Sequence, residues 1–215
     1  MAMKEALKNS YTDSNQSGIL SRLIFELSKL PGLGERSAER LAFYMLKMSE
    51  PERVNLAEAV LALREVKLCR KCYNFVSRNS DVCCQVCSDE ARDQSVICVV
   101  EQPEDLWKIE KTAIFNGIYH VLHGVISPLD GTGPEHIYLK QLIARIKETK
   151  PKEIILSTNP TAEGDHTALY ILRELKPLQL KVTRLGRGIP AGSSIEYLNK
   201  AILIDALRER KEQVF

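Results

Sequence analysis

Apolar residues recur at helical spacing over the first third of the chain. A 3.6-residue period predicts two short amphipathic helices on either side of a glycine-containing turn. Their apolar positions are Leu20, Leu23, Ile24 and Leu27 in the first helix and Ala38, Leu41, Ala42 and Met45 in the second. Ser49 and Glu52 form a capping-box pattern, which predicts a third helix running towards Val66. Residues 19–67 are therefore expected to be a helical module that follows a polar leader over 1–18.

The pattern changes twice in the rest of the chain. Residues 69–87 are polar and turn-rich, whereas short β-branched runs alternate with helical patterns from Val96 onward. The predicted strands are 96–100, 119–124, 153–158 and 180–185, and the predicted helices are 104–113, 135–150 and 162–176. This alternation predicts a mostly parallel sheet with helices on both faces. Residues 196–210 read as helix again, so the chain is expected to be a multidomain α+β protein with a C-terminal helical tail.

The amino-acid composition indicates what class of protein this is. Of the 215 residues, 44% are hydrophobic and 27% are charged, which is typical of a soluble globular chain. No apolar run approaches the roughly 20 residues that a membrane-spanning helix needs, and the N-terminal residues lack the apolar core of a secretory signal. We therefore expect no membrane association and a cytoplasmic location. Six cysteines in such a chain indicate reduced thiols that bind a metal rather than disulfides.

Basic residues are segregated locally, although the net charge is only +2. Residues 64–80 hold five basic side chains against the single acid Glu65, and residues 178–195 hold three basic side chains and no acid. Basic stretches of this kind are more often solvated faces than binding surfaces, but each is also a candidate contact for nucleic acid.

Two Cys-x-x-Cys pairs, separated by eleven residues, give the strongest chemical signal in the chain. The candidate metal ligands are Cys69, Cys72, Cys84 and Cys87. Four thiolates favour one structural Zn²⁺ per chain, with iron as the less favoured ion, and they leave no open position for catalysis by zinc. Cys83 makes the second pair ambiguous, but the spacing favours Cys84. Cys98 is expected to be a small buried hydrophobic residue.

Aromatic residues interleave with the basic residues of the cysteine loop. Tyr73 and Phe75 alternate with Arg70, Lys71 and Arg78. Such a mixture suits nucleic acid, because bases stack on aromatic rings and phosphates attract cations. It suits packing of the loop equally well, so both interpretations stay open.

The turn between the first two helices carries the clearest signal for DNA. Glycines let a hairpin adopt positive φ and let its backbone N–H groups approach a phosphate, and the next helix adds the positive end of its dipole. At 100° per residue, the basic residues of the second helix share one face, opposite the apolar stripe and beside Phe43. The predicted DNA contacts are Gly32, Gly34, Arg36, Arg40 and Lys47. The alternative is a helical hairpin whose glycines serve only the turn.

Several motifs in register resemble one known family. These are LPGLGERSAERLAFYML (30–46), the two cysteine pairs, ICVVEQPEDL (97–106), GVISPLDGTGP (124–134), STNPTAEGDHTALYI (157–171) and RGIPAG followed by EYL (187–198). They cover residues 19–210 in the order seen in the RecR family of bacterial recombination mediators. The chain departs from the family in a longer leader and in Ala191-Gly192, where the family usually has a Gly-Gly pair.

The resemblance implies a domain order and a function. The implied segments are a helix-hairpin-helix module (19–67), a four-cysteine zinc finger (68–92), a Toprim domain (95–190) and a C-terminal oligomerisation segment (191–215). It further implies a ring-like dimer or tetramer that binds single- or double-stranded DNA without sequence preference. Such a protein acts with RecO, and in some bacteria RecF, to load RecA onto single strands coated by single-strand-binding protein. The DNA-contacting basic residues of the family fall on Arg36 and Arg40.

A Toprim domain raises the question of catalysis. Toprim enzymes hold Mg²⁺ with a Glu after the first strand and an Asp-x-Asp pair after a later strand, and Glu101 fills the first place. Asn159 stands where the next acid is expected. Glu163 and Asp165 follow at the start of a helix, where they either stabilise the helix dipole or contact a partner or a weakly bound Mg²⁺.

We therefore expect no catalytic residues and no enzymatic activity. The alternatives are a Mg²⁺-dependent Toprim nuclease or primase-like enzyme, which Glu101, Glu163 and Asp165 alone support, and a coloured iron–sulfur or rubredoxin-like redox protein.

Overall fold

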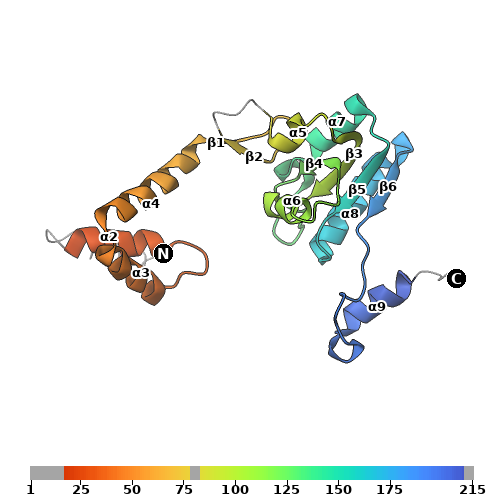
Figure 1. Ribbon diagram of the computed structural model, residues 1–215. Coiled ribbons are helices and arrows are strands. Elements are labelled where there is room, and N and C mark those ends of the chain that lie inside the picture. Colours follow the sequence, from red (N-terminus) through yellow and green to blue (C-terminus); the bar gives the residue numbers. More distant parts are fainter. Residues whose placement is uncertain (1–16, 78–82, 211–215) are drawn as a thin grey trace. The chain divides into compact units, whose positions relative to one another are not determined.

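The computed structural model describes residues 17–77 and 83–210 (Figure 1). The polar leader predicted over 1–18 lies almost wholly outside these residues, as does Arg78. The chain divides into two compact units, Met1–Arg64 and Glu65–Phe215, and each is described by itself. Among the described residues, no helix has the length and apolar content to cross a membrane.

The first unit is helical, as predicted. Its helices are α2 (Ser17–Ser28), α3 (Glu35–Lys47) and α4 (Glu50–Ala62), followed by the 3₁₀ turn η1 (Leu63–Glu65). Ala38 and Ala42 of α3 are fully buried, and these small side chains let α2 and α3 pack closely. The capping box is confirmed: the backbone N–H and the hydroxyl of Ser49 both donate to Glu52 Oε2, at 2.8 and 2.7 Å.

The second unit begins with a small cysteine module, residues 66–88. It consists of the antiparallel strands β1 (Val66–Leu68) and β2 (Phe75–Ser77) and the short helix α5 (Gln85–Ser88). The third predicted helix therefore ends before Val66, which is already in β1. Strands of three residues are too short to show a period of two, so the sequence pattern did not reveal them.

A four-stranded parallel sheet in the order β4-β3-β5-β6 forms the centre of this unit. Its strands are β3 (Asp93–Val100), β4 (Gly117–Val121), β5 (Glu153–Ser157) and β6 (Lys181–Arg184). The connecting helices are α6 (Pro103–Glu110), α7 (Leu139–Thr149) and α8 (Ala162–Leu175), with 3₁₀ turns η2 (Pro134–His136) and η3 (Lys176–Leu178). The predicted parallel sheet is confirmed.

Helices cover both faces of the sheet, as the sequence predicted. Ile97 and Val99 of β3 pack with buried residues of α7 and α8. The alternate residues Cys98 and Val100 point to the other face, where they pack with Leu106 of α6. This alternation follows from the two-residue period of a strand.

Most predicted elements differ in extent from those observed: β3 begins three residues before the predicted strand, and α6 ends three residues before the end of the predicted helix. Three further differences have a local cause or change the type of element. The strand predicted over 119–124 ends at Val121, because His123 and Gly124 adopt positive φ. The helix predicted over 135–150 begins as η2 and continues as α7. The C-terminal helix is α9 (Lys200–Arg208), capped where the Asn199 side chain accepts from Ile202 N at 3.0 Å, and the turn η4 (Ile195–Tyr197) precedes it.

Candidate nucleic-acid interface and metal centre

The turn between α2 and α3 is built by two glycines that play different parts. Gly32 has φ +80°, and the turn closes where Leu33 N donates to Leu30 O at 3.1 Å. Gly34 is extended, with φ −77° and ψ 165°, and is the N-cap of α3. The expectation of positive φ is thus right for Gly32 and wrong for Gly34. In the described part of the chain, no atom beyond the two chain neighbours lies within 4 Å of a Cβ built on either glycine, so the backbone here faces open space.

One face of α3 is basic and exposed. Arg36, Arg40 and Lys47 are exposed, and none of them forms an ion pair with a carboxylate of the described residues. Phe43, which shares this face, keeps 48% of its surface exposed. Ala38 and the buried residues around it lie on the opposite face of α3, which packs against α2. Three unpaired cations and an aromatic ring are therefore presented beside the glycine turn.

The four predicted metal ligands lie together. Their Sγ atoms are all within 4.8 Å of one another and all four residues are buried. The Sγ atoms of Cys72 and Cys84 are 3.4 Å apart, and Cys84 N donates to Cys69 Sγ at 3.3 Å. A tetrahedral zinc site with Zn–S distances of about 2.3 Å has sulfur atoms about 3.8 Å apart, so the spacing suits such an ion. The four thiols share protons: hydrogen bonds from its neighbours lower the pKa of Cys69, and the same contacts raise the pKa of Cys72 and Cys87.

The two remaining cysteines lie outside this group. Cys98 is buried in the sheet, its Sγ is 3.1 Å from Ser157 Oγ, and burial raises its pKa to about 11. It is therefore an unreactive core residue, as expected. Cys83 is only partly buried, and the four-thiol group contains Cys84 in its place, in agreement with the spacing argument.

The cysteine module is fixed to the sheet by backbone bonds and stacked rings. Val121 N donates to Cys72 O at 2.8 Å, and His123 Nε2 lies 2.6 Å from Tyr73 O. The ring of Tyr73 stacks on Tyr138, with centroids 4.2 Å apart. Packing is thus the observed role of Tyr73. Phe75 contacts His123 at its edge but stays 42% exposed.

The predicted acid Glu101 is buried at the carboxyl end of β3 and is fully engaged. Asn159 donates its backbone N–H to Glu101 Oε1 at 2.7 Å and its Nδ2 to Oε2 at 2.6 Å. Gly164 lies against both residues: a Cβ at that position would meet Asn159 O at 2.1 Å and Glu101 Oε1 at 2.7 Å. The start of α8 therefore packs directly on this carboxylate.

Asp165 is paired with two arginines from the end of the sheet. Arg184 Nη2 donates to Asp165 Oδ1 at 2.8 Å, and Arg187 donates to both carboxylate oxygens. The Arg187 guanidinium is the main reason that the pKa of Asp165 falls to about 2. Glu163 is half-buried, and its backbone carbonyl accepts from Thr167 Oγ1 at 2.8 Å. Among the described residues only the four cysteines form a group of three or more potential metal ligands, so the three acids do not converge.

Comparison with known proteins decides the family. Residues 20–63 match the family described as "RecR, helix-hairpin-helix", and residues 95–186 match the Toprim domain. The chain is 46% identical over 194 residues to recombination protein RecR of Heliobacterium modesticaldum, an alignment that covers 90% of this chain and 96% of the relative. The chain belongs to the RecR family. The same protein of Chloroherpeton thalassium is 47% identical over 201 residues, covering 91% and 98% of the two chains, and that of Rhodopirellula baltica is 44% identical over 199 residues, covering 92% and 98%.

Membership in the RecR family gives the two modules their names. The helical unit carries the RecR helix-hairpin-helix, a module that suggests DNA binding, and the parallel sheet with its helices is the Toprim domain. Both agree with the fold that the sequence predicted.

Arg184 and Arg187 are the site residues that sequence reasoning did not single out. The excess of basic residues over 178–195 was the available signal, but it did not show that they pair with Asp165. That contact depends on β6 lying beside β5, which places the residues after β6 near the start of α8.

Proposed function

We propose that this RecR-family protein is a non-enzymatic recombination mediator that binds DNA without sequence preference. In this proposal it acts with RecO, and in some bacteria RecF, to load RecA onto single strands coated by single-strand-binding protein. The resemblance described above supports the partners. The observation that carries DNA binding is the exposed basic face of α3 beside an open glycine turn.

The proposed DNA contact uses the backbone and the side chains together. The first N–H groups of α3 follow Gly34, which brings no Cβ, and the positive end of the helix dipole lies at the same point. Arg36 and Arg40 then add guanidinium groups that bind phosphates, Lys47 extends the basic face by two further turns, and Phe43 offers a ring for stacking. Contacts of this kind recognise the phosphate backbone and not the base sequence.

The proposed absence of catalysis rests on the state of the Toprim carboxylates. Both oxygens of Glu101 accept hydrogen bonds from Asn159, and Asp165 is paired with Arg184 and Arg187. Carboxylates engaged in this way are poor ligands for Mg²⁺, which requires several free oxygen ligands in octahedral geometry. A Toprim nuclease or primase would instead cleave or extend DNA with Mg²⁺ and lose that activity on Glu101→Gln.

The four cysteines are proposed to hold one structural Zn²⁺. Cys69, Cys72, Cys84 and Cys87 would complete its coordination, so the ion would supply folding energy and no open position for chemistry. A colourless protein is expected, in contrast to an iron–sulfur or rubredoxin-like protein. Reduced thiols also fit the proposed cytoplasmic location.

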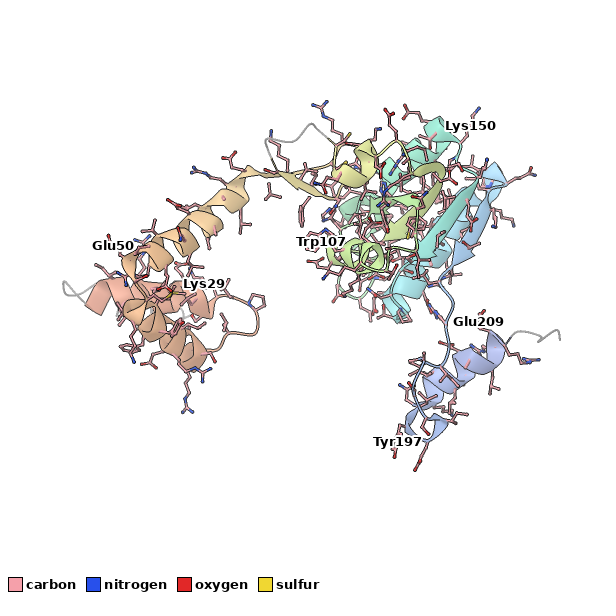
Figure 2. All side chains as sticks on the ribbon, in the orientation of Figure 1. Lys29, Glu50, Trp107, Lys150, Tyr197 and Glu209 are labelled. Carbon is pink, nitrogen blue, oxygen red and sulfur yellow. The ribbon has the colours of Figure 1, made fainter. Side chains whose placement is uncertain are left out.

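Exposed apolar residues support a homo-oligomer, a ring-like dimer or tetramer. None of the thirteen residues of α4 is buried, although Val54, Val60 and Leu61 are apolar and 46–60% exposed. In the proposed C-terminal oligomerisation segment, 191–215, Tyr197 is 82% exposed and its side chain projects from the chain (Figure 2). Helices with such surfaces are stabilised by packing against another chain.

The double variant Arg36→Ala/Arg40→Ala tests the proposal. We expect it to lower the affinity for single- and double-stranded oligonucleotides of unrelated sequence to the same degree, because only phosphate contacts are lost. Fluorescence anisotropy of labelled DNA, with and without RecO, measures this. Lys140→Ala/Lys147→Ala removes the same charge from α7 and should leave affinity unchanged. Equal affinity of the Arg36→Ala/Arg40→Ala variant and the wild type would contradict the proposal.

A further inference from the structure

A cavity of about 280 Å³ opens at the carboxyl edge of the Toprim sheet. It lies between the loops that follow β5 and β6 and one side of α6, and residues 157–160 and 184–187 form most of its wall. In open parallel sheets, small ligands bind beyond the carboxyl ends of the strands. The volume is at the lower end of ligand pockets, and suits one small molecule or the terminal group of a larger one.

The charged residues that line this cavity are mostly basic. Lys108, Arg184 and Arg187 contribute three positive charges, and Asp105 is the one acid in the lining. The Asp105 carboxylate is already in use, because its Oδ2 accepts from Gln102 N at 3.2 Å and its Oδ1 lies 3.9 Å from Lys108 Nζ. The lining therefore has an excess of positive charge that Asp105 does not neutralise.

The same edge of the sheet is poorly suited to a metal ion. Asn159 lines the cavity at the position where Toprim enzymes have an acid. Its backbone and side-chain N–H groups donate hydrogen bonds to both carboxylate oxygens of Glu101. Asp165 does not line the cavity and is bound by both arginines. Lys108, Arg184 and Arg187 outnumber their carboxylate partners Asp105 and Asp165, so the site keeps an excess of positive charge. Such a site favours an anion, whereas an enzyme of the Toprim class binds a divalent cation there.

The arginines are held in place before any ligand binds. Arg184 Nη2 donates to Thr158 Oγ1 at 3.2 Å as well as to Asp165, and Arg187 is fixed by the same carboxylate. Their side chains remain 31% and 25% exposed, so donors are left for a ligand. A planar guanidinium with fixed orientation favours phosphate, which accepts two parallel hydrogen bonds. Pro160 and Leu185 add apolar surface beside these donors.

We propose that this cavity binds a phosphate group directly, without a divalent cation, and that the group belongs either to a small nucleotide or to the end of a DNA strand. Lys108, Arg184 and Arg187 hold the phosphate oxygens, and Pro160 and Leu185 contact the remainder of the molecule. The cavity and the hairpin face of α3 belong to different units of the chain.

Calorimetric titration of the full-length protein with inorganic pyrophosphate, in buffer free of Mg²⁺, tests the site. We expect saturable binding that weakens by about tenfold or more on Lys108→Glu, because one cation is replaced by an anion. The Lys108 side chain is 77% exposed, so this change leaves the fold intact. Lys111→Glu is the matched control: it makes the same change at an exposed position that does not line the cavity and should bind pyrophosphate as the wild type does.

Two further titrations identify the source of the phosphate. AMP and ATP represent nucleotides, and a short oligonucleotide with or without a 5′-phosphate represents a DNA end. The variant Arg36→Ala/Arg40→Ala is used for the DNA arm, and it should keep its pyrophosphate binding even if the proposed DNA-binding function is wrong. The inference is overturned if no saturable binding occurs up to about 10 mM pyrophosphate. It is overturned equally if binding requires Mg²⁺ or is unchanged in Lys108→Glu.

Discussion

Asn159 shows how one side chain can change the chemistry of a familiar site. An aspartate at this position would repel Glu101, and the two carboxylates would together bind a cation. Asn159 instead donates hydrogen bonds to Glu101 from its backbone N–H and from its side-chain amide. The buried carboxylate is thereby satisfied within the chain. At the scale of single residues, we propose that this exchange suits the site to binding rather than to the metal-dependent chemistry of the Toprim enzymes.

His120 gives the protein a predictable dependence on pH. Its ring is fully buried, Nε2 lies 2.8 Å from Tyr138 O, and Nδ1 has no hydrogen-bond partner among residues 17–77 and 83–210. Burial lowers its pKa from 6.5 to about 3. Because the unfolded chain takes up a proton below 6.5 and the folded chain does so only near 3, stability is lost as the pH falls through this window.

We expect the free energy of unfolding to fall by about 1 kcal/mol through His120 alone between about pH 7 and about pH 5.5. Urea unfolding of the wild type and of His120→Gln measures it. Glutamine cannot titrate and keeps a donor for Tyr138 O, so its stability should change less over the same range. Identical pH profiles would show that His120 is not the responsible group.

Cys83 and Cys84 are adjacent, so metal content can decide which of them is the ligand. We expect Cys83→Ser to keep one zinc per chain and Cys84→Ser to lose most of it, because Cys84 Sγ lies within the four-thiol group. Atomic absorption on the purified variants measures this. Retention of zinc by Cys84→Ser together with its loss from Cys83→Ser would reverse the assignment.

At the scale of elements, the sequence predicted what local rules determine. The capping box at Ser49, the alternation of strands and helices, and the four metal ligands all follow from residues close together in the chain, and the structure confirms the capping box, the alternation and the clustering of the cysteines. The hairpin β1–β2 and the pairing of Asp165 with Arg187 were not predictable in this way. Each depends on a contact between two segments, and the sequence pattern of one segment does not indicate that it contacts the other.

The glycine turn was predicted as an element, but the part played by each glycine was not. Both glycines were expected at positive φ, and only Gly32 has it, because Gly34 already has the extended conformation of an N-cap. Periodicity locates a turn between two helices, but it does not show which of its residues takes the left-handed conformation.

Substitution of the two glycines should therefore separate stability from DNA binding. Gly32→Ala is expected to destabilise the helical unit by about 1 kcal/mol, because alanine is strained at φ +80°. Gly34→Ser should keep the stability of the unit, since serine is a good N-cap. It should weaken DNA binding, since the serine hydroxyl accepts hydrogen bonds from the N–H groups that are proposed to bind a phosphate. Thermal unfolding and DNA anisotropy of both variants measure this. Undiminished DNA affinity in Gly34→Ser would argue that the turn does not approach the strand.

At the scale of the whole molecule, the chain combines surfaces of different kinds. The helix-hairpin-helix presents cations, the Toprim domain presents a basic cavity, and α4 presents apolar side chains. The proposed recombination mediator, which would hold DNA while it binds partners, needs several such surfaces at once. Repetition of the short hairpin face in an oligomer would also raise its effective concentration on one DNA strand.

The oligomer can be tested through α4. We expect Val60→Asp/Leu61→Asp to reduce the molar mass in solution, because two charges would enter an apolar contact between chains. Multi-angle light scattering measures the mass. Leu129→Asp is the control, since Leu129 is 96% exposed in a loop of the other unit and should leave the mass unchanged. A wild type that is strictly monomeric at micromolar concentration with DNA would contradict the proposed ring.

The central claim, that the guanidinium groups beside the glycine turn neutralise DNA phosphates, is tested most directly by the salt dependence of binding. The logarithm of the association constant falls linearly with the logarithm of salt concentration, with a slope of about 0.7–0.9 per neutralised phosphate. We predict that Arg36→Ala/Arg40→Ala binds with a slope shallower by about 1.4–1.8 than that of the wild type, on every DNA sequence tested. Parallel lines for the two proteins would contradict the claim, because they would show that these arginines release no counterions from DNA.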